Sequence, residues 1–467
     1  MPTVAGVDSS TQSCKVVVCD ADTGEVLHRG RAAHPDGTEV SPEVWWQALR
    51  AAGGGLLEQV DAVAVAGQQH GLVALDAAGQ PVRDALLWHD TRSAQAAADL
   101  VADLGGPEKW AEAVGTVPVA AITVAKLRWL AEHEPRAADR TDRVLLPHDW
   151  LTWRLCGGPG TSAEPVTDRG DASGTGYWSP ADGAYRQDLV ALAFDGRTPR
   201  LPRVLGPYEA AGRTPHGALV APGTGDNMGA ALGLGIRPGD VVISLGTSGT
   251  AFALSDHPVG DPTGAVAGFA DATGRFLPLV CTLNAARVLS STARMLGIAL
   301  DDLGPLARTA EPGAGGLVLL PYLGGERTPN LPDAAGSLTG LRTANMHPRN
   351  VARAAVEGML CNMADALDRL RAQQVDARRV FIIGGAARAP VVGEIAAEIF
   401  GTPVTVPEPE EYVALGAARQ AAWTLAGTPE PPHWPLAATR EIAAPADTST
   451  GLRIRANYGR ARTLLHG

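Results

Sequence analysis

Lysine is scarce in this chain of 467 residues. Of the 39 basic residues, only Lys15, Lys109 and Lys126 are lysines, and the others are arginines. Acidic residues outnumber basic ones, and the net charge of −11 is spread along the sequence. A nucleic-acid partner or an anionic membrane surface is therefore not expected. Where arginine serves most basic positions, a lysine is favoured at sites that need a compact ammonium group.

Cysteine is also rare, and long apolar runs are missing. The five cysteines show no paired spacing, which argues against a disulfide framework or a zinc site. No stretch of about 18 residues is free of charges and Pro/Gly breaks, so no membrane span is expected. The first residues lack a basic flank, so no signal peptide is expected either. With 45% hydrophobic residues, the composition indicates a globular cytoplasmic protein of two or three domains.

Short apolar runs alternate with helical patterns along the chain, which is typical of α/β layering. The run at 4–7 meets a polar turn and a second run at 15–19, and a similar arrangement returns at 241–245 and 251–255. This repeat predicts two halves of similar build, 1–235 and 236–467. Further strands are expected at 63–66 and 380–383, and helices at 121–134 and 356–370.

The first polar turn carries phosphate-binding chemistry. In the segment VDSSTQSCK, Asp8 ends an apolar strand, Ser10 and Thr11 form the turn, and Lys15 follows. Turn amides and hydroxyls can donate to phosphate oxygens, the lysine adds positive charge, and the carboxylate can engage Mg²⁺. An ordinary β-hairpin turn uses the same residue types, so this segment alone leaves both interpretations open.

The second turn strengthens the phosphate hypothesis. In SLGTSGT (244–250), Gly246, Thr247 and Ser248 permit close approach of the backbone to a ligand. Two such turns in similar halves suggest two hairpins that grip one triphosphate. A third segment, IIGGAAR, places Gly384 and Gly385 after a strand, where they could contact a nucleotide or serve only a strand–helix connection.

Two other segments offer groups for catalysis and for sugar binding. In GTGDN, Asp226 and Asn227 follow glycines, so Asp226 is either a helix cap or a general base beside a substrate hydroxyl. A position near a helix N-terminus predicts a low pKa for this carboxyl. In GQQHG, Gln69 and His70 end a strand, and LWHDTR (87–92) adds polar groups nearby. Several polar groups beside glycines suit a polyol.

The chain resembles the FGGY carbohydrate kinase family over nearly its whole length. GSLTGL and NVARAAVE (336–357) fit the family's C-terminal signature, and TVAKLRWLAEHE (123–134), with Lys126 and Trp129, fits the N-terminal one. LLPHDWL, TDRGDASGT, PYLGGERTP and EYVALGAA have family counterparts in the same order. GQQHG is similar to the segment in members that phosphorylate xylulose, and the Arg-Glu pair of glycerol kinases is absent.

The resemblance implies two actin-like (ribonuclease H-like) domains with an active-site cleft, ATP and Mg²⁺ as cofactors, and D-xylulose as substrate. By motif, it implies that Asp226 is the catalytic base and that Asp8 lies beside the metal. Gln69, His70 and Asn227 would bind the sugar with Asp226. Nucleotide contacts are expected from Ser10, Thr11, Lys15, Gly246, Thr247, Ser248, Gly384 and Gly385, and a homodimer is the expected assembly.

Four positions depart from the family pattern: Ser10 and Ala386 stand where glycines are usual, Ala389 replaces a serine, and Gln69 replaces a methionine. Other functions also fit part of the pattern. A kinase for ribulose, L-xylulose or arabinitol would share almost every motif. An actin-like ATPase would need neither GTGDN nor the polar residues of GQQHG and LWHDTR that suit sugar binding. Glu326 and Arg327 could contact nucleotide or brace the fold.

Overall fold

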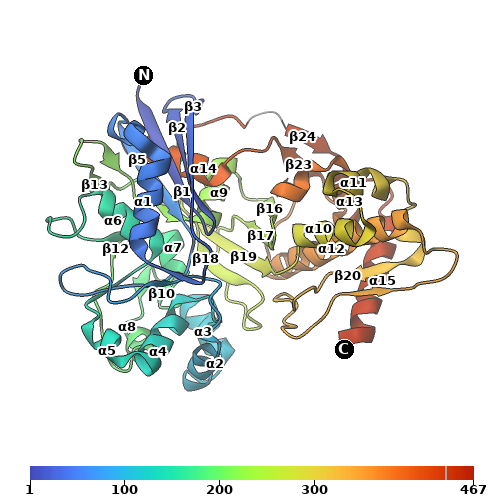
Figure 1. Ribbon diagram of the computed structural model, residues 1–467, viewed down its shortest axis with the longest axis horizontal. Helices are drawn as coiled ribbons and strands as arrows, with labels where there is room; N and C mark the ends of the chain where they lie inside the picture. Colours follow the sequence, from blue (N-terminus) through green and yellow to red (C-terminus); the bar gives the residue numbers. More distant parts are fainter. Residues whose placement is uncertain (437–438, 467) are drawn as a thin grey trace. The chain divides into compact units, whose positions relative to one another are not determined.

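The computed structural model describes residues 1–436 and 439–466 (Figure 1). By internal contacts the chain forms two compact units. The first contains Met1–Ile236, Ser255–Leu277 and Glu411–Pro435. The second contains Arg237–Leu254, Pro278–Glu410 and the described residues from Leu436 onward. Among the described residues, no helix has the length and apolar character needed to span a bilayer.

The first unit is built on a seven-stranded mixed sheet with the order β13-β14-β5-β1-β2-β3, in which β15 also pairs with β5. Strands β1, β2 and β3 are antiparallel neighbours, whereas β5 runs parallel to β1. The strands are β1 (Thr3–Ser9), β2 (Ser13–Asp20), β3 (Val26–Ala33), β5 (Ala62–Gly67), β13 (Gly212–Arg213), β14 (Leu219–Val220) and β15 (Thr224–Gly225).

Alternate residues of these strands face two different helical layers, as the period of two in a strand requires. Val7 of β1 and Val65 of β5 belong to a core that includes residues of α1 (Pro42–Gly53) and α6 (Pro147–Leu155). Their neighbours Val4 and Ala64 pack with the alanines of α14 (Tyr412–Ala426). Small residues let α14 approach closely: a Cβ added at Gly6 would lie 1.9 Å from the Ala414 carbonyl oxygen.

Smaller elements complete the first unit and carry its loops (Figure 1). The short strands are β4 (Glu39–Val40), β6 (Val73–Leu75), β7 (Ala85–Leu86), β8 (Arg143–Leu145), β9 (Val166–Asp168), β10 (Trp178–Ser179), β11 (Ala184–Tyr185), β12 (Arg203–Leu205) and β18 (Ala267–Ala270). The helices are η1 (Gly54–Glu58), α2 (Ala94–Asp103), α3 (Pro107–Val114), α4 (Thr123–His133), α5 (Pro135–Arg140), α7 (Arg169–Ser173), α8 (Gln187–Ala193) and α9 (Asp226–Leu234).

The second unit repeats the pairing of the first. Its sheet contains β19-β17-β16-β22-β23-β24 in that order, and each neighbouring pair has the same direction as in β3-β2-β1-β5-β14-β13. These strands are β16 (Asp240–Leu245), β17 (Gly249–Ala253), β19 (Phe276–Thr282), β22 (Arg379–Ile383), β23 (Val404–Pro407) and β24 (Thr439–Ile442). Its other elements are α10 (Ala286–Leu296), α11 (Leu300–Arg308), η2 (Ala314–Gly316), β20 (Val318–Leu320), β21 (Ser337–Thr339), α12 (Pro348–Ala372), η3 (Gly385–Arg388), α13 (Pro390–Phe400) and α15 (Ser449–His466).

The α/β class predicted from the apolar pattern is confirmed, and the strand pairing recurs in both units. Segments 255–277 and 411–435, which the sequence division placed in 236–467, belong to the first unit. The helix expected at 121–134 is α4, and Pro135, which ends it, begins α5. The helix expected around Val356 is α12, which is longer than the pattern indicated. Both polar turns join antiparallel strands, since β1 pairs with β2 and β16 with β17.

Candidate active site

The β1–β2 turn of the first unit gathers the groups that the sequence assigned to phosphate binding. Asp8 is buried at the end of β1, and Lys15 lies opposite it on β2 with Nζ 3.4 Å from Asp8 Oδ2. The Ser10 hydroxyl donates to Asp8. Thr11 accepts a hydrogen bond of 2.8 Å from the indole Nε1 of Trp88. The turn therefore presents a carboxylate, an ammonium group and two hydroxyls together.

The charged groups at this turn shift one another's pKa values. Burial raises the pKa of Asp8 above its usual range, and the nearby Lys15 opposes that shift. Burial acts to lower the pKa of Lys15, but Asp8 and Glu411 outweigh it, so the pKa is raised. Glu411 Oε2 lies 2.6 Å from Lys15 Nζ. Lys15 therefore stays positively charged in the physiological range.

Asp226 begins α9 directly after β15, and its side chain is part of a hydrogen-bonded group. Asp226 Oδ1 accepts from the Asn227 backbone nitrogen at 2.8 Å and from Asn227 Nδ2 at 2.9 Å. Asn227 Nδ2 also donates to Gln69 Oε1 at 3.1 Å. The N-cap of α9 is Gly225, so the alternative in which Asp226 serves as the cap is wrong.

The expectation of a low pKa for Asp226 is wrong as well. Burial raises this pKa to about 7, and the negative charges of Asp8 and Asp171 add to the effect. A helix N-terminus favours a carboxylate by a few tenths of a kcal/mol to about 1 kcal/mol, which is too little to offset desolvation and two like charges. A carboxyl group with this pKa can accept a proton near neutral pH.

Gln69 and His70 follow β5, and Gln69 belongs to the same hydrogen-bonded group. Gln69 is buried, and its Nε2 has no hydrogen-bond partner among the described residues. His70 adopts a left-handed backbone conformation with φ 68°, which is rare for a non-glycine residue. Its Nδ1 lies 2.7 Å from the Gly174 carbonyl oxygen, a contact that assigns the ring proton to Nδ1. Backbone strain of this kind concentrates at functional sites.

In the second unit, the residues of the β16–β17 turn and those after β22 are partly or fully exposed. Thr247 is exposed, and Gly246 and Ser248 are half-buried. The carbonyl oxygen of Gly246 accepts from the backbone nitrogen of Ala286, and that of Thr247 accepts from the backbone nitrogen of Ala285. These two residues lie at the start of α10. Gly384 and Gly385 are exposed after β22. Gly384 is the N-cap and Gly385 the first residue of the short helix η3, which precedes α13. They therefore do not lie at the N-terminus of a long helix.

The residues that replace family glycines, Ser10 and Ala386, adopt backbone conformations without strain. Among the described residues other than glycine, positive φ occurs at His70, Asp195, Ala314 and Gln374, so Ser10 and Ala386 adopt ordinary conformations. Ala389 is the N-cap of α13 and supplies no side-chain cap.

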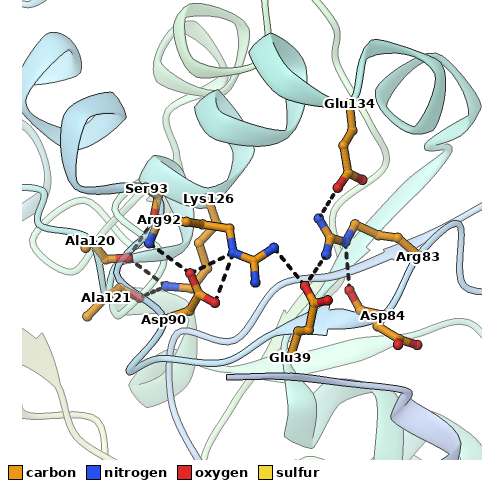
Figure 2. Close-up of polar contacts among 10 residues, drawn as sticks. All are labelled: Glu39, Arg83, Asp84, Asp90, Arg92, Ser93, Ala120, Ala121, Lys126 and Glu134. Atoms are coloured by element: carbon orange, nitrogen blue, oxygen red, sulfur yellow. Dashed lines mark hydrogen bonds and ion pairs between the residues drawn. The ribbon is translucent and has the colours of Figure 1, made fainter. Parts of the chain in front are cut away.

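The polar groups of LWHDTR are engaged by other residues of the first unit (Figure 2). Arg92 Nε donates to both carboxylate oxygens of Asp90, at 2.9 and 3.0 Å, and Arg92 also pairs with Glu39. Lys126 is fully buried and donates to the carbonyl oxygens of Ala120, at 2.8 Å, and Ala121. Burial lowers the pKa of Lys126 to about 7, and the charge of Asp90 acts in the opposite direction.

Glu326 braces the second unit. Its buried carboxylate accepts from the Leu283 backbone nitrogen at 2.6 Å and from the side-chain amides of Asn284 and Asn362, each at 3.0 Å. These bonds tie the segment after β19 to α12. Of the two interpretations of GERTP, the structure supports the brace for Glu326.

Sequence reasoning assigned no role to Glu411 or to a buried ionisable cluster of His148, Asp149, Asp168 and Asp171. Both lie in segments that matched the family pattern, EYVALGAA, LLPHDWL and TDRGDASGT. Charged residues inside otherwise apolar segments were the available signal, because such groups are rarely buried without a partner.

Two protein-family models cover most of the chain. The model described as the N-terminal domain of the FGGY family of carbohydrate kinases matches residues 3–233. The model of the C-terminal domain of that family matches residues 241–425.

Curated relatives and solved structures agree with this match. A xylulose kinase from Streptomyces coelicolor is 48% identical over 91% of this chain and 89% of its own length. A xylulose kinase from Escherichia coli is 34% identical over 91% of this chain and 90% of its own. The crystal structure of xylulose kinase from Bifidobacterium adolescentis superposes with a TM-score of 0.90 at 44% identity, covering 99% of both chains. The chain belongs to the FGGY family of carbohydrate kinases, and its two sheet-based units have the actin-like fold of that family.

Proposed function

We propose that the chain transfers the γ-phosphoryl group of ATP to the terminal O5 hydroxyl of D-xylulose. The observation that carries this proposal is the hydrogen-bonded group of Asp226, Asn227 and Gln69, in which a carboxyl of pKa about 7 lies beside polar side chains. The choice of sugar rests on the full-length similarity to xylulose kinases.

Asp226 acts as the general base in this mechanism. It accepts the proton of the attacking hydroxyl and orients the oxygen in line, a role worth roughly 10²–10⁴-fold in rate. Asn227 holds one carboxylate oxygen, so the other can face the substrate. Gln69 Nε2, buried without a partner among the described residues, can donate to a sugar oxygen. A sugar that lacks this oxygen would leave the donor unpaired.

Phosphoryl transfer depends mostly on positioning and on charge neutralisation. In this proposal the nucleotide is bound by Lys15 and the turn residues Ser10 and Thr11, and by Gly246, Thr247, Ser248, Gly384 and Gly385. We assign sugar and phosphate binding and the catalytic base to the N-terminal half of the sequence, 1–235, and ATP binding to the C-terminal half, 236–467.

Asp8 fits a Mg²⁺ ion. It is a buried carboxylate whose pKa is raised by burial, so a nearby cation would stabilise its charged form. Carboxylate oxygen is the ligand that Mg²⁺ prefers in proteins, usually with retained waters. Such an ion would neutralise charge on the phosphates.

The cellular setting follows from the substrates. ATP and free ketopentose meet in the cytoplasm, where we place the enzyme.

We also propose a homodimer, because exposed leucines (Leu452, Leu464 and Leu465) line one helix, α15. Size-exclusion chromatography with light scattering tests this assembly, and a monomer mass would contradict it.

A coupled ADP-release assay tests the reaction. MgATP is supplied with D-xylulose, L-xylulose, D- and L-ribulose, glycerol or D-arabinitol, and Asp226→Asn is measured alongside. Turnover that is strongest with D-xylulose and lost in the variant supports both substrate and base. Stronger turnover with another sugar would reassign the substrate, and turnover that depends on neither sugar nor Asp226 would contradict a kinase.

A further inference from the structure

Four ionisable side chains that are fully or almost fully buried form a cluster next to the segment that precedes Asp226. His148 and Asp149 lie on α6, Asp168 is the N-cap of α7, and Asp171 lies on α7. His148 Nδ1 is 2.6 Å from Asp171 Oδ2 and 3.3 Å from Asp149 Oδ1. The hydroxyls of Tyr177 and Tyr185 add no formal charge, since burial raises both pKa values.

The cluster is in contact with the turn that carries Asp226. A Cβ added at Gly223 would lie 2.5 Å from His148 Cδ2, so the imidazole ring packs directly against this backbone. The Thr224 hydroxyl donates to Asp168 Oδ2 at 2.8 Å. Asp168 Oδ1 in turn accepts from the Asp171 backbone nitrogen at 2.8 Å. Residues 223–226 are therefore held by His148 on one side and by Asp168 on the other.

Burial raises the pKa of all three carboxyls, that of Asp149 to about 7 and that of Asp168 to about 6. A positive charge nearby stabilises the ionised forms, because an uncompensated buried charge is strongly unfavourable. The separation of 2.6 Å between His148 Nδ1 and Asp171 Oδ2 is that of a charge-assisted hydrogen bond. Two atoms bound tetrahedrally to one zinc ion at about 2.0–2.2 Å would lie farther apart. The geometry thus favours a proton on Nδ1, shared with Asp171, over a metal ion between these ligands, whereas Nε2 has no hydrogen-bond partner among the described residues.

The electrostatic environment agrees with that geometry. Burial acts to lower the pKa of His148, but the charges of Asp149, Asp171 and Asp168 outweigh it and raise the pKa to about 9. Asp171 also faces Asp226 and raises the pKa of that carboxyl, as does Asp8 from β1. The cluster and the base therefore form one electrostatic system.

We propose that His148 is a buried imidazolium ion and a positioning residue, which stabilises the carboxylate of Asp171 and so helps to hold the 223–226 turn and its base Asp226 in place. This inference rests on the proposed function, because it takes Asp226 to be the base. His148 itself touches neither sugar nor nucleotide in this scheme.

NMR of the full chain labelled with ¹⁵N-histidine tests the charge state. The signal of His148 is assigned by its loss in His148→Asn. We expect both ring nitrogens to be protonated at pH 7.5, with deprotonation only near pH 9. A neutral ring at pH 7.5 would overturn the proposal, and this readout does not depend on which sugar the enzyme uses.

Kinetics test the positioning role. His148→Asn keeps a donor for Asp171 but loses the charge, so kcat should fall at least about tenfold while KM for MgATP changes less than about twofold. His148→Lys keeps a cation and should retain more of kcat. Equal kcat in His148→Asn and wild type, or equal losses in the two variants, would overturn the role.

Leu151→Ala is the matched control for stability. Leu151 lies on the same helix, fully buried in the core and outside the cluster. Its truncation should lower Tm and leave kcat unchanged, which separates loss of packing from loss of charge. Wild type and Leu151→Ala also report the D-xylulose reaction itself, so failure of the proposed function is seen separately.

Discussion

Lys15 Nζ lies 2.6 Å from Glu411 Oε2, although 396 residues separate the two in the chain. The pair joins β2 to Glu411, the N-cap residue of α14. The ion pair restricts the orientation of the Lys15 side chain, which suits its proposed role as a phosphate ligand.

Replacement of Lys15 should weaken nucleotide binding. Lys15→Met removes a charged donor to phosphate, and such hydrogen bonds contribute about 1.5–3 kcal/mol, so KM for MgATP should rise roughly 10- to 100-fold. Steady-state kinetics at saturating sugar measure this change. Lys109→Met is the control, because Lys109 is exposed and its ion pair among the described residues is with exposed Glu112. Equal KM values in the two variants would contradict the assignment.

The pH dependence of the reaction should report Asp226. Because its pKa is raised to about 7, kcat/KM should increase with pH through that value as the base becomes ionised. The negative charge of Asp171 contributes to the raised pKa, so Asp171→Asn should move the acid limb to lower pH. Profiles of kcat/KM from pH 5 to 9 test this. An acid limb that moves to higher pH would contradict the assigned coupling.

Lys126 should make stability depend on pH in the alkaline range. Its pKa in the folded chain is about 7, against a usual 10.5, because burial disfavours the ammonium form. Between these values the unfolded chain binds a proton that the folded chain does not. The free energy of unfolding should therefore rise with pH by up to about 1.4 kcal/mol per unit relative to Lys126→Met.

Denaturant unfolding of wild type and Lys126→Met at pH 7.5 and 9.5 measures this difference. Lys109→Met should follow wild type at both pH values, since its side chain is exposed. A constant difference between wild type and Lys126→Met would indicate that Lys126 remains protonated throughout.

Gly384 and Gly385 should respond differently to alanine. Gly384 has φ 94°, and an added Cβ would lie 2.7 Å from the Leu245 carbonyl carbon and oxygen. Gly384→Ala should therefore cost about 1–3 kcal/mol of stability through backbone strain alone, with a further loss from the clash. A Cβ added at Gly385 would meet no atom within 4 Å, so Gly385→Ala should be as stable as wild type. Thermal unfolding compares them, and equal Tm values would contradict this account.

Local patterns were enough to predict both hairpins and their repetition. The runs 4–7 and 241–245 are apolar because alternate residues face two buried layers, and the polar residues between strands favour turns wherever they occur. Asp8 and Lys15 were nominated because a carboxylate and a lysine flank a Ser/Thr turn after an apolar strand. Gln69 and Asp226 were nominated because their segments combine glycine with polar groups. Segments 255–277 and 411–435 join the first unit, which no local pattern indicated.

The sequence by itself determined the α/β class, the two similar halves and the family, because strand period, turn chemistry and ordered motifs are encoded locally. Tertiary structure alone decided the raised pKa of Asp226, the partner of Lys15 and the charged cluster at His148. These properties depend on desolvation and on charges from distant segments, which meet only when the chain folds.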